Sequence, residues 1–185
     1  TPAAPKNLVL LKEVLEALGK GCPQVEFTPV VVAAPADLEK AAALKDSVDG
    51  YLVYCVTLNW PFTGFLAQIG KLGKPTLVAD EFLGGCGMFL VGYAQMRRQN
   101  IAAGAVSSTR LEDVVAVAKL FAGIRKPGAT AESFARECQA AYRKTFPAAG
   151  EMRCREDKLT LTGTSECVAR LRRSPEFDAA LRLDA

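Results

Sequence analysis

The sequence predicts an α/β fold of the doubly wound, flavodoxin- or Rossmann-like type, with a mostly parallel sheet and a small C-terminal appendage. Several short runs are continuously apolar, which is typical of strands covered on both faces. Amphipathic helical stretches separate these runs, and the connections are short, which favours parallel strands joined by helical crossovers. The chain has 185 residues, half of them hydrophobic, so it is long enough for one core.

The first predicted element is a helix over residues 7–19. Leu8, Leu11, Leu15 and Leu18 form one apolar stripe along it, at the spacing of a helix face. Helices of doubly wound sheets normally follow a strand, so we expect the chain to be part of a longer protein with a strand upstream.

Strand and helix then alternate. A buried strand is predicted at 25–33, which is apolar and rich in β-branched residues. Pro35 and Asp37 favour a helix that runs to about residue 45. The turn at Asp49-Gly50 leads into the apolar run 51–56, a second predicted strand.

The alternation continues through the middle of the chain. Helices are predicted at 63–72 and 88–99, the first of them ended by Gly73. Short apolar runs predict buried strands at 75–79 and 101–106.

An amphipathic helix is predicted at 111–122, and Ser107, Ser108 and Thr109 before it offer N-caps. The character of the sequence changes at Lys126-Pro127-Gly128. We therefore predict a parallel α/β domain over 1–125, followed by 126–185 as a helical appendage or the start of a further domain. The later part contains a helical stretch at 131–145, an alternating run at 159–162 and a last helix candidate at 165–173.

Composition excludes several classes of function. The chain has no histidine, which removes imidazole bases and most transition-metal sites. The net charge of +3 comes without a long basic run, so a nucleic-acid partner is not expected. No apolar stretch approaches the ~20 residues of a membrane helix, so no membrane partner is expected either.

Six cysteines are present, and none forms a CxxC pair, so neither a zinc ribbon nor a thioredoxin-like motif is indicated. Cys154 and Cys167 flank a Thr-rich stretch and are the first pair to suspect of a disulfide. A cytoplasmic location is favoured, whereas that disulfide would indicate an exported protein.

Ligands of open α/β sheets bind outside the carboxyl ends of the strands. That rule selects the loops after the runs 51–56, 75–79 and 101–106. We predict no catalytic residue and no metal ligand there. The predicted ligand-binding residues are Thr57, Asn59, Trp60, Asp80, Glu81, Gly84, Gly85, Cys86, Gly87, Ser107 and Ser108.

Each of these residues has a binding interpretation and a structural alternative. The glycines at 84, 85 and 87 free the backbone to approach a ligand, or they serve only tight turns. Asp80 and Glu81 could accept hydrogen bonds from sugar hydroxyls, or they are surface acids. Trp60 could stack on a sugar ring, or it packs in the core. Cys86 precedes a helix N-terminus, where thiol pKa values fall, but no base partner accompanies it.

Two stretches carry a resemblance to a known family. Asp49-Gly50-Tyr51-Leu52-Val53-Tyr54 leads to Lys74-Pro75-Thr76-Leu77-Val78-Ala79-Asp80-Glu81 and then to Gly84-Gly85-Cys86-Gly87. Over residues 25–120, this pattern resembles the N-terminal α/β domain of L-fucose and L-arabinose isomerase-like proteins.

The resemblance implies binding of a small sugar or polyol, without the catalytic metal site. In that family a divalent metal is held by acidic residues and a histidine in later domains. No cofactor is therefore expected in this chain, and Mn²⁺ could enter only in a longer parent protein. If the chain is part of an enzyme, the resemblance implies an aldose–ketose isomerase.

Several alternatives stay open. The same strands are similar to one lobe of periplasmic sugar-binding proteins and their repressor relatives. The loops could instead face a partner, as in an interaction or assembly module that self-associates or contacts other domains of a parent chain. A receiver or carrier is less well supported. Asp80 could be its phospho-acceptor, but no lysine follows the 101–106 run.

Overall fold

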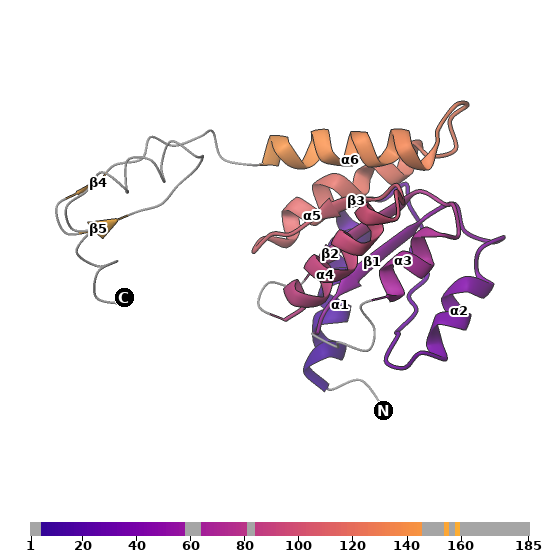
Figure 1. Ribbon diagram of the computed structural model, residues 1–185, viewed down its shortest axis with the longest axis horizontal. Coiled ribbons are helices and arrows are strands. Elements are labelled where there is room, and N and C mark those ends of the chain that lie inside the picture. Colours follow the sequence, from indigo (N-terminus) through magenta and orange to yellow (C-terminus); the bar gives the residue numbers. More distant parts are fainter. Residues whose placement is uncertain (1–4, 58–63, 81–83, 146–153, 156–157, 160–185) are drawn as a thin grey trace. The chain divides into compact units, whose positions relative to one another are not determined.

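The structure is a computed structural model. It describes residues 5–57, 64–80, 84–145, 154–155 and 158–159. The chain divides into two compact units, residues 1–145 and residues 146–185. The first unit holds the α/β fold (Figure 1). In the second unit the described residues form a short antiparallel pair, β4 (Cys154–Arg155) with β5 (Lys158–Leu159).

A parallel sheet lies at the centre of the first unit. Its described strands are β1 (Tyr51–Cys55), β2 (Thr76–Asp80) and β3 (Gly104–Val106), in the order β1-β2-β3. Cys55 lies opposite Asp80, and Ala79 lies opposite Val106, so the three strands end at one edge of the sheet. All five residues of β2 are buried, as expected for a central strand covered on both faces.

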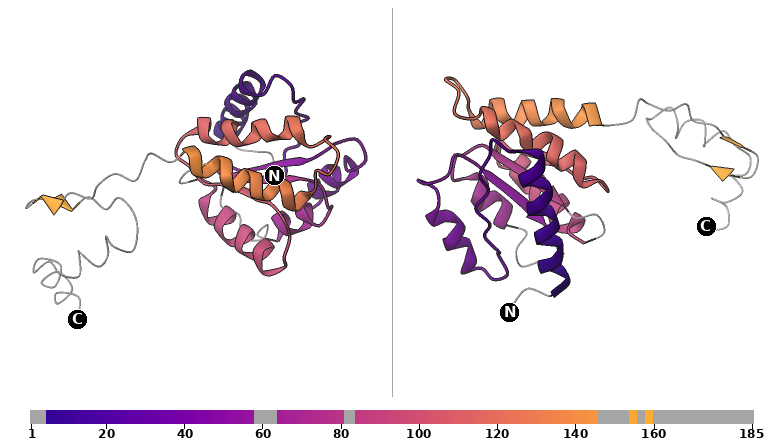
Figure 2. Two further views of the ribbon diagram at one scale, coloured as in Figure 1. Left: turned by 90° about the horizontal axis from the view of Figure 1, so that it is seen from above. Right: turned by 180° about the vertical axis from the view of Figure 1, so that it is seen from behind.

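Helices cover both faces of this sheet, which confirms the predicted α/β class. The right-hand view of Figure 2 shows α1 running past one edge of the sheet. The helices of the unit are α1 (Pro5–Gly21), α2 (Asp37–Ala43), α3 (Phe65–Gly70), α4 (Cys86–Arg98), α5 (Leu111–Ala118), the 3-10 helix η2 (Lys119–Gly123) and α6 (Ala131–Thr145).

Two clusters of buried side chains form the core, one on each face. The first cluster joins α1, α5, η2 and α6 to the sheet, and within it the rings of Phe121 and Phe134 lie 4.8 Å apart. The second cluster joins α2, α3 and α4 to the opposite face. Alternation along the strands produces this division, because Leu77 faces the first cluster and Val78 faces the second.

The first unit extends beyond the predicted boundary at residue 125. Helix α6 belongs to it, because Phe134 and Cys138 are buried in the first core cluster. A Cβ atom on Gly104 of β3 would lie 2.5 Å from Cys138 Cβ, which shows how closely α6 approaches the sheet. The predicted helix at 131–145 is correct, but it completes the α/β unit and is not part of an appendage.

The predicted strand at 25–33 is wrong. Residues 25–33 form neither helix nor strand, and all of their side chains are half-buried or exposed. No backbone hydrogen bond joins this segment to β1 among the described residues. A strand exists only as one of a pair, so an apolar, β-branched sequence without a neighbour in reach does not become one.

Smaller differences concern element ends. The predicted strand 101–106 is shorter, because pairing with β2 begins only at Gly104. The N-cap position of α5 is Arg110, and no side chain of the predicted Ser-Ser-Thr run occupies it. Residues 160–162, the helix candidate at 165–173 and the suspected partner Cys167 lie outside the described residues.

No helix in the described part of the chain combines the length and the apolarity needed to cross a membrane.

Candidate functional site

Three of the predicted site residues lie at or just after the ends of the three strands. Thr57 comes two residues after β1, Asp80 ends β2, and Ser107 follows β3. The parallel register places all three at one edge of the sheet, as the sequence predicts. Their exposures differ: Asp80 is only 1% exposed, Thr57 is half-buried, and Ser107 is exposed.

Asp80 and Ser107 form the centre of this edge. The Ser107 hydroxyl donates a hydrogen bond to Asp80 Oδ2 at 3.1 Å. Because its proton is directed at the carboxylate, the Ser107 oxygen presents its lone pairs elsewhere. The pair therefore offers an exposed hydrogen-bond acceptor whose orientation is fixed by a buried carboxylate.

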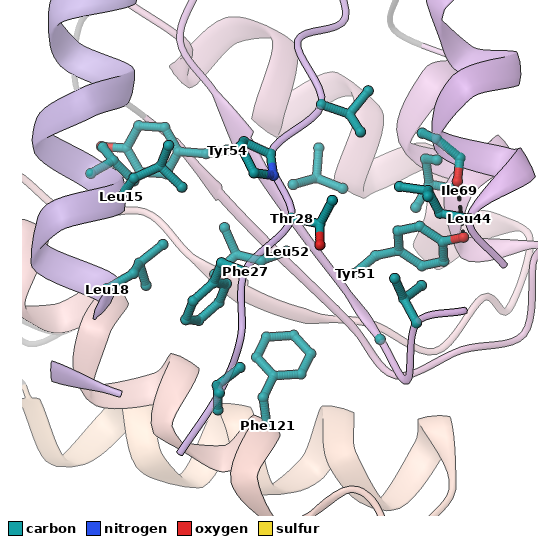
Figure 3. Close-up of a pocket in the computed structure, with 18 of the residues that line it drawn as sticks. Leu15, Leu18, Phe27, Thr28, Leu44, Tyr51, Leu52, Tyr54, Ile69 and Phe121 are labelled. Atoms are coloured by element: carbon teal, nitrogen blue, oxygen red, sulfur yellow. Dashed lines mark hydrogen bonds between the residues drawn. The ribbon is translucent and has the colours of Figure 1, made fainter. Parts of the chain in front are cut away.

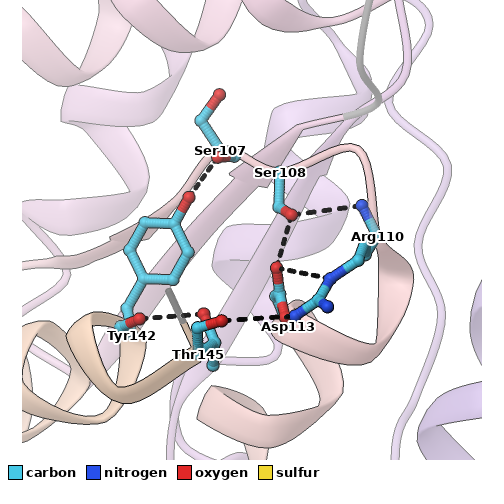
Figure 4. A network of polar contacts seen from close by, with 6 residues as sticks. All are labelled: Ser107, Ser108, Arg110, Asp113, Tyr142 and Thr145. Atoms are coloured by element: carbon cyan, nitrogen blue, oxygen red, sulfur yellow. Dashed lines mark hydrogen bonds and ion pairs between the residues drawn. The ribbon is translucent and has the colours of Figure 1, made fainter. Parts of the chain in front are cut away.

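Tyr142 of α6 holds the backbone of the same loop. Its hydroxyl donates to the Ser107 carbonyl oxygen (Figure 4). Burial raises the pKa of Tyr142, although the hydrogen bond to Ser107 opposes this, and the nearby carboxylates of Asp113 and Asp80 raise it further. The phenol stays protonated at neutral pH and so remains a donor. Ser107 is thus held through its side chain by β2 and through its backbone by α6.

Ser108 is engaged in the start of α5. Its hydroxyl donates to Asp113 Oδ2 at 2.6 Å and accepts from the Arg110 backbone N–H at 3.1 Å. The Arg110 guanidinium binds both oxygens of Asp113 and also donates to the Thr145 carbonyl oxygen at 3.3 Å. Ser108 is therefore part of a network that joins α5 to the end of α6, as Figure 4 shows, and its hydroxyl is already used.

The network favours the ionised form of Asp113. The hydrogen-bonded Arg110 guanidinium lowers the pKa of Asp113, burial opposes this, and the Ser108 hydroxyl lowers the pKa further. The folded pKa lies below the unfolded value of about 3.9, so the network stabilises the fold fully above that pH. This stabilisation is lost as the pH falls through the lower, folded pKa.

Asp113→Asn should therefore destabilise the chain near neutral pH and matter less in acid. A loss of about 1–3 kcal/mol is expected near pH 7, because the buried Asp113 loses its charge-assisted hydrogen bonds to the exposed Arg110 guanidinium. The difference from the original chain should shrink below about pH 4. Urea unfolding followed by circular dichroism at both pH values checks this. Glu112→Gln, at the exposed neighbouring acid, is the control, and an equal effect of both variants would contradict the prediction.

One glycine of the glycine-rich loop, Gly85, is required for close packing against β1. Gly85 is buried, and a Cβ atom there would lie 1.7 Å from the Cys55 carbonyl oxygen at the end of β1. Gly84, Cys86 and Gly87 are half-buried, and Cys86 and Gly87 begin α4. Gly85 has an ordinary φ of −99°, so the need for glycine is steric contact with β1 and not an unusual turn.

Asn59, Trp60 and Glu81, which the sequence also predicts at this site, lie outside the described residues.

A large cavity lies elsewhere, beside the outer edge of β1. This β1-edge cavity has a volume of about 910 Å³. Two continuous stretches line it, residues 24–33 and residues 47–57, together with side chains from α1, α2, α3, α4 and η2. Figure 3 shows Leu15 and Leu18 of α1 and Leu52 and Tyr54 of β1 around it. Of the described residues predicted for the site, Thr57 alone lines this cavity.

Some polar groups of the β1-edge cavity are already engaged or protonated. The Tyr51 hydroxyl donates to the Ala41 carbonyl oxygen at 3.1 Å, and burial raises the pKa of Tyr51. Burial, helped by the Asp80 carboxylate, raises the pKa of the Cys55 thiol to about 12, so it is not a nucleophile near neutral pH. At one end Arg125 forms an ion pair with Asp49, 2.7 Å between Nη2 and Oδ2.

No group of three or more Cys, Asp or Glu side chains gathers into a metal site within the described ranges. Two buried acids near the strand ends serve other roles, because Asp80 accepts a hydrogen bond from Ser107 and Asp113 accepts one from Arg110.

Sequence reasoning missed Tyr142, Arg110, Asp113 and the β1-edge cavity. One signal for Tyr142 was present, because Phe134, Cys138 and Tyr142 follow one another at i, i+4 on a single helix face. Two of these three residues are buried against the sheet, which places the third at the strand ends.

Comparisons with known proteins give no relative for this chain: no family model, no curated protein and no solved structure matches it.

Proposed function

We propose that this chain binds a small sugar or polyol at the carboxyl-terminal edge of its parallel sheet. The observation that carries the proposal is the pair formed by Asp80 and Ser107, a buried carboxylate that orients an exposed hydroxyl at the end of the central strands. Ligands of open α/β sheets bind at this edge, because the loops after the strands diverge there.

The chemistry of the pair suits a hydroxyl-bearing ligand. Because the Ser107 hydroxyl donates its hydrogen bond to Asp80, its oxygen is oriented to accept a hydrogen bond from a ligand hydroxyl. Thr57, half-buried after β1, adds a second hydroxyl at the same edge. A sugar presents several hydroxyls that both donate and accept, and fixed acceptors of this kind give it orientation and specificity.

The proposal assigns binding and no reaction. It agrees with the resemblance to an isomerase-like domain, which implies binding of a small sugar or polyol without the catalytic metal site. Mn²⁺ would then belong to other domains of a longer parent protein, so binding to this chain should not require it.

A titration with pentoses, hexoses, deoxysugars and polyols tests the proposal, with and without Mn²⁺. The single tryptophan, Trp60, reports binding through its fluorescence, and calorimetry gives the affinity independently. Ser107→Ala should weaken binding about tenfold, the equivalent of one hydrogen bond. Asp80→Ala should have a similar effect, and Asp80→Asn should restore part of the affinity because it keeps an acceptor oxygen for Ser107.

Ser47→Ala is the matched control. Ser47 is an exposed serine between α2 and the start of β1, at the amino-terminal ends of the strands. Its hydroxyl donates to the Leu44 carbonyl oxygen. The Ser47→Ala variant should bind the sugar with the same affinity as the original chain. A folded chain that binds no member of the panel by either method would refute the proposal.

A second candidate function, an interaction or assembly module, is favoured by a different observation. The β1-edge cavity is lined mainly by apolar side chains and lies beside a sheet edge, where a partner polypeptide can add.

A further inference from the structure

The β1-edge cavity lies between two extended pieces of backbone. On one side is β1, which pairs with β2 alone among the described strands. On the other side is the segment 24–33, every residue of which lines the cavity. The backbone of the two pieces is not joined by any hydrogen bond in the described part of the chain. The cavity is thus a gap within the plane of the sheet.

The outer edge of β1 offers backbone groups to this gap. The Tyr51 N–H donates to the Pro75 carbonyl oxygen at 2.9 Å, toward β2. Backbone groups of successive strand residues point to opposite sides, so the N–H and C=O of Leu52 point away from β2. They face the β1-edge cavity, which Leu52 lines.

The segment 24–33 has the side-chain pattern of an outer strand. Val25 and Phe27 pack against the first core cluster, and Val30 and Val32 pack against the second, on the opposite face of the sheet. Odd and even residues thus face opposite layers, as in a strand. Pro29 between them has no N–H to donate, which is tolerated in a strand at a sheet edge.

The cavity is walled by apolar side chains on both faces of the missing position. Leu11, Leu15 and Leu18 of α1 line it on one face. Leu44, Phe65 and Ile69 line it on the other face. A strand in this position would be covered on both faces and would therefore consist of consecutive apolar residues.

We propose that the β1-edge cavity receives an extended, uncharged, β-branched strand of another polypeptide, which pairs with β1 on one side and with the segment 24–33 on the other. A partner that matches the five residues of β1 would extend about 16 Å, at about 3.3 Å per residue. The segment 24–33 then becomes the outer strand that its sequence pattern describes. This mode of recognition is strand addition, in which main-chain hydrogen bonds supply affinity and side-chain pockets supply specificity.

Backbone chemistry favours a strand over a lipid or another apolar small molecule. A hydrocarbon ligand would fill a volume of this size, but it would bury the N–H and C=O of Leu52 without hydrogen-bond partners. A peptide strand fills the same space and satisfies these groups. The inference does not depend on sugar binding, because the edge of β1 and the Asp80–Ser107 pair are different places.

The probe for the test is a synthetic peptide with five consecutive Val and Ile residues, the length of β1, and lysines at both ends for solubility. The full chain should bind it saturably, one peptide per chain, with a higher midpoint of thermal unfolding. Hydrogen exchange at the Leu52 amide should slow. A peptide of the same side chains with N-methylated backbone should bind at least about tenfold more weakly, because pairing hydrogen bonds are lost.

Protein variants provide the second arm. Thr28→Arg places a charge at an exposed residue that lines the cavity and should abolish peptide binding. Leu90→Arg makes the same change at a residue of α4 that is 62% exposed and outside the cavity, and should bind normally.

Three outcomes would overturn the inference. The peptide and its N-methylated analogue could bind equally, which would mean that backbone pairing is not involved. A fatty acid could raise the unfolding midpoint while the peptide does not, which would identify a lipid site. The third outcome is that neither the peptide nor the fatty acid binds and that the Leu52 amide is already protected from exchange in the chain alone. This would mean that the gap is closed in solution.

Discussion

Gly85→Ala is expected to destabilise the α/β unit more than the same substitution at Gly64, which is also a glycine at the N-cap of a described helix. The new Cβ atom would lie 1.7 Å from the Cys55 carbonyl oxygen and 2.3 Å from its carbon. Both are backbone atoms of β1, so no side chain can rotate away, and either α4 or the end of β1 must move. A cost of about 3 kcal/mol or more is expected, measured by urea unfolding followed by circular dichroism.

Gly64→Ala is the matched control for this prediction. Gly64 is also the N-cap of its helix, α3, and also has a helical backbone, with φ −74° against −99° for Gly85. The nearest atom to a Cβ at Gly64 is Gln68 Nε2 at 3.9 Å, an ordinary contact. Little change in stability is expected for Gly64→Ala. Equal effects of the two variants would show that helix capping, and not contact with β1, explains the need for Gly85.

The same substitution bears on the proposed sugar site. Gly85 fixes the distance between α4 and the end of β1, and Thr57 follows that end two residues later. From the sequence, the three glycines at 84, 85 and 87 either give a ligand access to the backbone or serve only tight turns. For Gly85 the structure supplies the structural reason, close packing on a strand that is adjacent in space and thirty residues away in the chain.

Local pattern was sufficient to predict most elements of the fold. The strands at 51–56 and 75–79 and the helices at 7–19 and 131–145 were predicted correctly, because burial of a strand or one helix face imposes a regular spacing on apolar residues. The convergence of Thr57, Asp80 and Ser107 also followed, since parallel strands all end at one edge.

Pairing and distant contacts could not be predicted in this way. The run 25–33 has the composition of a strand as clearly as 51–56, but its neighbouring position in the sheet is a cavity. Whether a strand forms depends on a partner, which a local pattern does not reveal. In the same way, the contact from Tyr142 to the Ser107 carbonyl spans 35 residues, and only the docking of α6 brings the two together.

Two leucines of the same core, Leu77 and Leu52, should differ in their contribution to stability. Leu77→Ala in the central strand should cost about 3–5 kcal/mol, because Leu77 is fully buried and its removal leaves a new void. Its methyl group occupies the space above Gly104, where a Cβ would lie 3.3 Å from Leu77 Cδ1. Small residues beside it cannot expand to fill the void, so the cost should be at the upper end. Urea unfolding of the Leu77→Ala variant and of the original chain measures this loss of stability.

Leu52→Ala should cost much less, about 1–2 kcal/mol, although Leu52 packs against the same core cluster. Leu52 is half-buried and borders the β1-edge cavity, so truncating it enlarges an existing space and removes few packed neighbours. Similar costs for the two leucines would mean that Leu52 is as tightly enclosed as Leu77 and that the cavity is filled in solution. A clear difference would mean that the edge of β1 is open, which is the condition under which a further strand can add to this sheet.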